Sequence, residues 1–106
     1  MSLERIIKAL IGLGLSRVDA EVYVYLAKKG SMKANALANS LNYSRNKIYS
    51  ALRNLTKEDL VTKEGTIYSA LPFEEALELL IQREKEKAEY MNQRKKELLV
   101  KWKKEE

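Results

Sequence analysis

The chain has 106 residues, 45% of them apolar, a net charge of +5, and neither cysteine nor histidine. This length suffices for one small domain, and the missing residue types exclude disulfides, cysteine–histidine zinc sites and histidine catalysis. No apolar run reaches the roughly 18 residues that span a bilayer, and the sequence begins without a signal-peptide pattern. We therefore expect a cytoplasmic protein with no membrane partner.

Two helices are expected at the start of the chain. Apolar residues at helical spacing predict the first over residues 3–11. It ends at Gly12 and Gly14, because glycine tolerates left-handed geometry beyond a helix. Ser16 is the expected N-cap of the second helix, with Asp19 three residues on as in a capping box. This second helix is apolar on two sides, which predicts a central position in the fold.

A helix-turn-helix is predicted next. A short helix over about 33–41 and a longer one over about 45–58 are joined by a tight turn at Asn42 and Tyr43. Ser44 is expected to cap the longer helix, because its hydroxyl can accept from the first free backbone amides.

A β-hairpin is expected after the second of these helices. Short strands are predicted over residues 60–62 and 66–69, with Lys63, Glu64 and Gly65 as the tip. The order of helix, helix, helix-turn-helix and hairpin is that of a winged helix. We therefore predict a mainly α fold with a small β-hairpin over residues 1–71. This part also carries all the excess charge, with 11 Lys and Arg against 6 Asp and Glu.

The longer helix of the pair has an apolar back and a basic front. Ile48, Leu52 and Leu55 share one side, and the opposite side is polar and basic. Arginine can donate two hydrogen bonds to guanine, asparagine can pair with adenine, and lysine can neutralise phosphate, so this front suits a major groove. A solvated helix face is the alternative. The candidate DNA contacts are Lys33, Ser44, Arg45, Asn46, Lys47, Tyr49, Ser50, Arg53, Asn54, Lys57 and Lys63.

Two tyrosines lie near this face. Tyr49 could touch a phosphate or a base edge, but we favour packing against the hairpin with its hydroxyl exposed. The sequence leaves the role of Tyr43 open.

Residues 72–106 are predicted to be one long dimerisation helix, from Phe73 to about Lys104 and roughly 48 Å long. Steps of four and three residues trace a mostly apolar seam of coiled-coil type. The seam is Leu77, Ile81, Glu84, Ala88, Met91, Lys95, Leu98 and Trp102.

The two charged seam positions favour an antiparallel homodimer. In a parallel pair, Glu84 would face its own copy and so would Lys95. An antiparallel pair centred between Glu89 and Tyr90 instead places Glu84 opposite Lys95 and Leu77 opposite Trp102. The alternative is a helix folded back on its own head. A twofold dimer would bind a palindromic site with half-sites about 34 Å, or a multiple of this distance, apart.

The sequence resembles the winged-helix domain of the TrmB family of archaeal transcriptional regulators. The resemblance rests on Leu13-Gly14-Leu15-Ser16, on Asp19-Ala20 and Val22-Tyr23, on Ala34 with Leu37-Ala38, on Arg45-Asn46-Lys47-Ile48-Tyr49, on Ala51-Leu52 with Leu55, and on Pro72 with Glu74-Glu75-Ala76-Leu77. It implies sequence-specific binding of double-stranded DNA and control of transcription, with residues 44–55 as the recognition helix. Larger family members carry a C-terminal effector domain that binds sugars, whereas this sequence ends at Glu106, so no small-molecule effector is predicted.

Three further functional expectations follow. An enzyme is not expected, because the chain has no glycine-rich phosphate loop and no clustered carboxylates beyond solvated helix faces. No cofactor or metal is predicted. The alternatives to a dimeric regulator are a protein-interaction module and a sequence-tolerant architectural DNA-binding protein.

Overall fold

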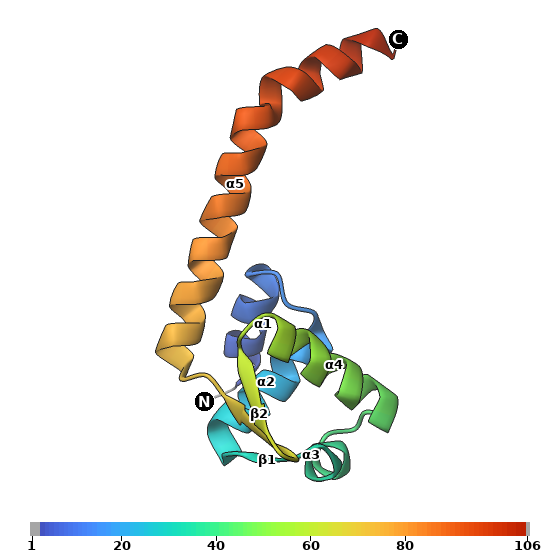
Figure 1. Cartoon of the computed structure of the whole chain (residues 1–106), viewed down its shortest axis with the longest axis vertical. Helices are drawn as coiled ribbons and strands as arrows, with labels where there is room; N and C mark the ends of the chain where they lie inside the picture. Colours follow the sequence, from blue (N-terminus) through green and yellow to red (C-terminus); the bar gives the residue numbers. More distant parts are fainter. Residues whose placement is uncertain (1–2, 106) are drawn as a thin grey trace.

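The computed structural model describes residues 3–105. It contains α1 (Glu4–Gly12), α2 (Arg17–Lys29), β1 (Met32–Lys33), α3 (Ala34–Ser40), α4 (Arg45–Lys57), β2 (Val61–Glu64), β3 (Ile67–Ala70) and α5 (Phe73–Lys104). We use "head" for residues 3–71 and "tail" for residues 72–105. In Figure 1 the head is rounded and the tail leaves it as one long helix, in a molecule of 53 × 29 × 28 Å. The predicted mainly α fold, with a small sheet and a long last helix, is confirmed.

Helix α2 lies centrally in the head, as its apolar pattern predicted. Val22, Tyr23 and Leu26 are at most 1% exposed. The Tyr23 hydroxyl donates a hydrogen bond to the carbonyl of Leu71, so the end of the head is tied to its centre. Burial raises the pKa of Tyr23 to about 12.

Side-chain caps set the starts of the two longest helices of the head. The Ser16 hydroxyl accepts a hydrogen bond of 3.1 Å from the Asp19 amide, and the Ser44 hydroxyl accepts one of 3.3 Å from the Lys47 amide. Both caps were predicted, and each satisfies an amide that the helix leaves free. Gly14 has φ of +108° after α1, but Gly12 is the last helical residue rather than a breaker.

The sheet has three antiparallel strands in the order β1-β3-β2, whereas the sequence predicted a two-stranded hairpin. The two residues of β1 are too few to show the alternation that predicts a strand. Lys33 therefore lies in β1, opposite Ile67, and α3 begins one residue later. Lys63 and Glu64 belong to β2, so the predicted tip was wrong by two residues. The hairpin turns at Gly65 and Thr66.

The tail packs on the head only at its base. Ala76 and Leu80 are buried, with Leu77 and Leu79 partly buried beside them, whereas every described residue beyond Lys87 except Arg94 is exposed. The helix spans the predicted residues and curves in its last turns (Figure 1). The alternative of a tail folded back on its own head is therefore wrong.

Candidate nucleic-acid interface

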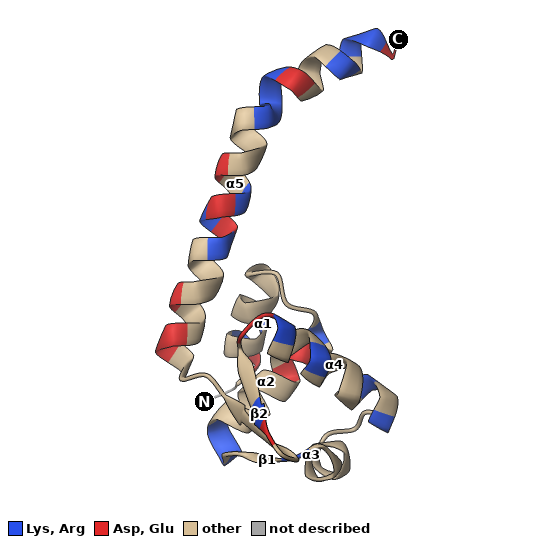
Figure 2. Cartoon of the chain, in the orientation of Figure 1, with Lys and Arg blue, Asp and Glu red and all other residues tan. Residues whose placement is uncertain are grey.

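Helix α4 presents a basic surface because its apolar residues anchor the opposite side. Ile48, Ala51, Leu52 and Leu55 are at most 1% exposed and fix the rotation of the helix about its axis. The thirteen residues of α4 include four lysines and arginines and no acidic residue. Figure 2 shows these cations spaced along the helix. The surface has the positive charge that is typical of nucleic-acid-binding proteins.

Five of the predicted contact residues form an unobstructed strip along α4. All five are exposed, and within residues 3–105 their side chains make no hydrogen bond or ion pair. The strip consists of Asn46, Lys47, Ser50, Arg53 and Lys57. Amide, hydroxyl and cationic groups are thus available on one face, which is the donor set that base edges and phosphates accept.

Two other predicted contact residues are held by the head itself. The Arg45 guanidinium donates to the side-chain oxygen of Asn35 on α3. The Asn54 amide donates to the Asp19 carboxylate across 3.4 Å. Asp19 is 8% exposed, and burial raises the pKa of its carboxyl. These contacts join α4 to α3 and α2, so Arg45 and Asn54 help to hold α4 in place.

The remaining predicted residues lie around the strip. Lys33 is exposed in β1, and Lys63 in β2 has its ammonium 5.5 Å from the centre of the Tyr68 ring. This cation–π contact holds the Lys63 side chain against the neighbouring strand, β3. Tyr49 is 38% exposed and is not among the residues packed on the core, so it is more open than the sequence suggested.

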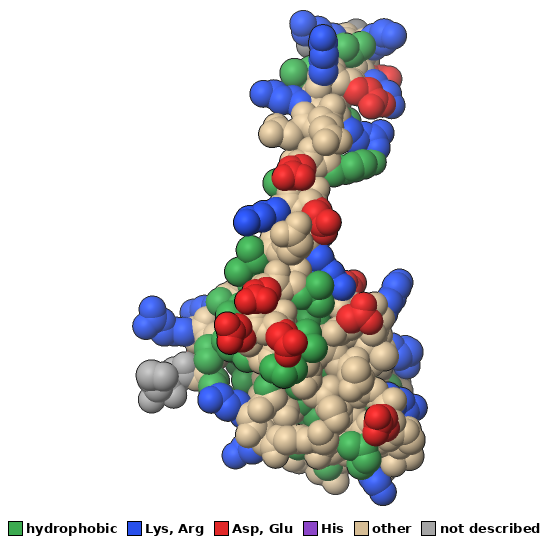
Figure 3. Space-filling model, turned by 60° about the vertical axis from the view of Figure 1, so that its left-hand side comes forward, with side chains coloured by type: hydrophobic (Ala, Val, Ile, Leu, Met, Phe, Trp, Pro, Cys, Tyr) green, Lys and Arg blue, Asp and Glu red, His purple; other side chains and the backbone are tan. Residues whose placement is uncertain are grey.

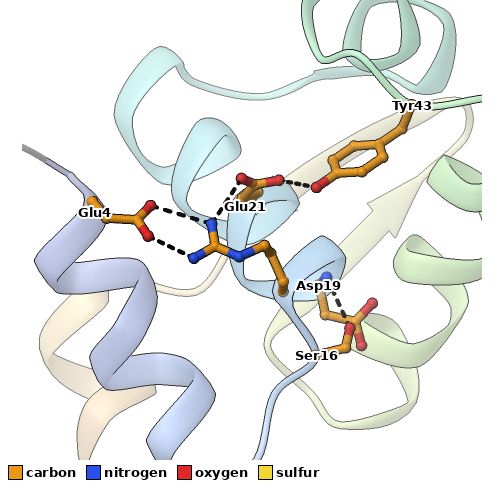
Figure 4. A network of polar contacts seen from close by, with 6 residues as sticks. Glu4, Ser16, Asp19, Glu21 and Tyr43 are labelled. Atoms are coloured by element: carbon orange, nitrogen blue, oxygen red, sulfur yellow. Dashed lines mark hydrogen bonds and ion pairs between the residues drawn. The ribbon is translucent and has the colours of Figure 1, made fainter.

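The turn before α4 is fixed by a polar network that the sequence did not reveal (Figure 4). The Tyr43 hydroxyl donates to the Glu21 carboxylate, and Glu21 accepts an ion pair of 3.3 Å from Arg17. Arg17 also pairs with Glu4. The hydrogen bond to Glu21 raises the pKa of Tyr43, and the bond from Arg17 lowers the pKa of Glu4.

Only the Arg17–Glu21 pair has a local sequence signal, since these residues lie four apart on α2; the other members lie on α1 and the α3–α4 turn. The effect of the network is local: Tyr43 directly precedes the α4 cap, Ser44, so the network holds the start of the basic helix.

The predicted seam of the tail is largely exposed. The exposed fraction is 43% at Ile81, 53% at Met91, 44% at Leu98 and 71% at Trp102. From Ala88 to Trp102 the seam lines a shallow apolar hollow of about 730 Å³ along one side of the helix. At the base, Leu77 packs partly on the head, and Glu84 lies 3.3 Å from Lys87 of its own helix.

Two negative findings apply to residues 3–105. No cluster of three acidic, cysteine or histidine side chains there could hold a metal ion. Within the same range, no helix is both apolar and long enough to cross a bilayer.

The fold and the basic helix together define a winged helix-turn-helix protein of the kind that binds nucleic acid. The family described as "Sugar-specific transcriptional regulator TrmB" matches residues 10–74, which is more than half of the chain. The chain belongs to the TrmB family, as its residues suggested. This membership supports a DNA-binding transcription regulator.

Individual relatives agree with this assignment. An uncharacterized protein of Methanocaldococcus jannaschii is 29% identical over an alignment of 92 positions, and the match covers 78% of this chain and 67% of that one. The structure of TrmBL2, an archaeal chromatin protein with a novel mode of DNA binding, superposes with a TM-score of 0.75 and 28% identity over 93% of this chain. The chain spans only 41% of the length of TrmBL2.

A further structural relative shares the fold. A possible transcriptional regulator from Methanosarcina mazei superposes with a TM-score of 0.65 over 92% of this chain and 88% of its own. Its identity of 18% supports the shared architecture alone.

Proposed function

We propose that this protein is a homodimeric transcription regulator whose α4 enters the major groove of double-stranded DNA. The observation that carries the proposal is the strip of Asn46, Lys47, Ser50, Arg53 and Lys57 on a helix with no acidic residue. The contact residues are the eleven that the sequence singled out. Within this set, Arg45 and Asn54 combine DNA contact with contacts to Asn35 and Asp19.

The head and the tail have different roles in this proposal. The winged helix over residues 1–71 binds DNA, and residues 72–106 join two copies. The outer half of α5 exposes Met91, Leu98 and Trp102, whereas most helix stability in proteins comes from packing an apolar face. A second copy supplies that packing.

Charge supports an antiparallel arrangement of the two tails. The base of α5 carries exposed Glu74, Glu75 and Glu78, whereas its last turn carries Lys101, Lys103 and Lys104. Figure 3 shows these acidic and basic groups at opposite ends of the tail. In the register centred between Glu89 and Tyr90, the basic tip of each tail lies beside the acidic base of the other. This complementarity is independent of the Glu84 and Lys95 pairing in the seam.

The geometry of the tail supports joint use of the two heads. At 100° per residue, the residues that contact the head, such as Ala76 and Leu80, lie roughly a quarter turn from the seam. A twofold axis perpendicular to two antiparallel helices therefore carries both heads to the same side. Both heads can then reach the same duplex.

The likeness to TrmBL2 supports a second candidate, which is architectural binding with little sequence preference. Arg53→Ala and Asn46→Ala distinguish the two. If these side chains read bases, each substitution should weaken binding to a preferred site by about 1–3 kcal/mol and binding to random duplex by much less. Equal weakening on both duplexes would favour the architectural candidate.

The salt dependence of binding separates both candidates from a protein-interaction module. We expect log Kd to rise steeply with log salt, and Lys57→Ala to reduce that slope by about one. Lys85→Ala is the matched control, because Lys85 is an exposed cation on the tail. A chain that binds no duplex at low salt would refute the proposal.

A further inference from the structure

Ion pairs join the tail to the end of the basic helix α4. They are additional to the apolar packing of the tail on the head. Arg83 Nη1 lies 2.8 Å from Glu58 Oε2, and Arg83 Nη2 lies 3.9 Å from Asp59 Oδ2. Glu58 and Asp59 directly follow the last residue of α4. One side chain of the tail therefore holds the end of the helix proposed to enter DNA.

Asp59 adopts a backbone conformation that disfavours an ordinary side chain. Its φ of 64° makes it the one non-glycine residue with positive φ in the described range 3–105. Glycine would adopt this conformation without steric cost. Aspartate at this position instead places a second carboxylate near Arg83.

The tail also passes close to the turn between α1 and α2. A Cβ at Gly14, in the turn between α1 and α2, would lie 3.1 Å from Glu84 Oε1 and 3.7 Å from Lys87 Nζ. The base of the tail packs on the core through Ala76 and Leu80 and pairs with the end of α4 through Arg83, and its Glu84 side chain lies near Gly14. Burial at Ala76 and Leu80 and the ion pairs of Arg83 thus hold the base of the tail at two places on the head.

We propose that Arg83, with Glu58 and Asp59, is a positioning residue that sets the distance between the two DNA-binding helices of the dimer. This inference rests on the proposed function. Arg83 lies 6 or 7 residues from the centre of the antiparallel tails, so the ends of the two α4 helices lie roughly 20 Å apart along them. Their positions relative to each other depend on the angle between each head and its own tail. Loosening that angle would relax the spacing between half-sites.

The first test uses distances in the absence of DNA. The chain has no native cysteine, so spin labels can be placed at Ser50→Cys on α4 and Gln93→Cys on the tail. The labelled chain is diluted with an excess of unlabelled chain, so that only distances within one chain are measured. We expect one narrow distance distribution in the otherwise native protein and a distribution at least about twofold broader with Arg83→Ala. Arg83→Lys, which keeps the charge, should stay close to the native width.

Two variants separate positioning from stability. Asp59→Gly removes one ion-pair partner and relieves the backbone strain, so we expect a broader distribution without a lower unfolding midpoint. The double variant Glu58→Arg with Arg83→Glu should restore the narrow distribution, and Lys85→Ala should not change it.

The second test uses duplexes with two half-sites whose spacing is changed by 2 base pairs, or roughly 70° of rotation. We expect the native dimer to lose at least about tenfold in affinity and Arg83→Ala to lose less than about threefold. Equal distance distributions for the native chain and Arg83→Ala would overturn the positioning role and leave the proposed function intact. A spacing preference unchanged by Arg83→Ala would also overturn it. Broadening with Arg83→Ala in a protein that binds no duplex would instead refute the proposed function.

Discussion

The head and the tail carry apolar residues at similar helical spacing but place them very differently. In the head, Leu52 is 1% exposed and Leu37 is fully buried, whereas in the tail Leu98 is 44% exposed and Trp102 is 71% exposed. The head therefore buries its own apolar residues, because its four helices and its sheet enclose them. The apolar residues of the tail stay exposed in a single chain. This is why the proposed function pairs the seam of the tail with a second copy.

The largest expected effect comes from weakening the head. Leu52→Ala leaves a cavity beneath the basic helix and should lower the free energy of unfolding by about 2–5 kcal/mol. The same truncation in the tail, Leu98→Ala, removes a side chain that is already 44% exposed in one chain. Urea unfolding at several protein concentrations separates them. The loss from Leu52→Ala should not depend on concentration, and the loss from Leu98→Ala should appear only where the native protein is dimeric. The same dependence on protein concentration for both variants would contradict the difference between head and tail.

The seam of the tail can be broken without disturbing the head. Leu98→Asp places a charge in the proposed interface and should raise the dimer dissociation constant at least about tenfold, as a buried unpaired charge costs several kcal/mol. Val100→Asp is the matched control, because Val100 is 48% exposed but lies outside the seam. Analytical ultracentrifugation measures both constants. Similar weakening by the two variants would show that the seam is wrongly placed.

The register of the tails is sharpened by exchanging charges. Glu84→Lys should weaken the dimer several-fold, because like charges then meet Lys95 across the seam. Adding Lys95→Glu should restore the native constant. Lys87→Ala removes the intrahelical partner of Glu84 without changing the seam, so we expect less than about a twofold effect. A double variant no better than Glu84→Lys would rule out the proposed register.

The smallest effect concerns the buried carboxylate behind the basic helix. Burial raises the pKa of Asp19 in the folded chain, so protonation favours the native state as the pH falls. Asp19→Asn lacks this titration. The stability of the native chain relative to Asp19→Asn should therefore increase from about pH 7 to about pH 4, as measured by urea unfolding. A constant difference across this range would contradict the raised pKa.

The sequence predicted what local patterns encode. The caps at Ser16 and Ser44, the buried side of α4 and the extent of α5 all follow from residue type and spacing within a few turns. The winged-helix order and the TrmB family also emerged from local motifs.

The features that the sequence missed depend on contacts between distant segments. Strand β1 has two residues and exists only because β3 pairs with it. Tyr43 meets Glu21 across 22 positions, and Arg83 meets Glu58 across 25. No periodicity links such residues, so only the folded arrangement reveals that they hold the start and the end of α4.

The central claim, that two copies present their basic helices to one duplex, is tested most directly by selecting bound sequences from a random duplex pool. The account predicts enrichment of two inverted half-sites whose centres lie about 34 Å, or a multiple of this distance, apart. A selection that enriches no sequence, or only a single site without inverted symmetry, would contradict it.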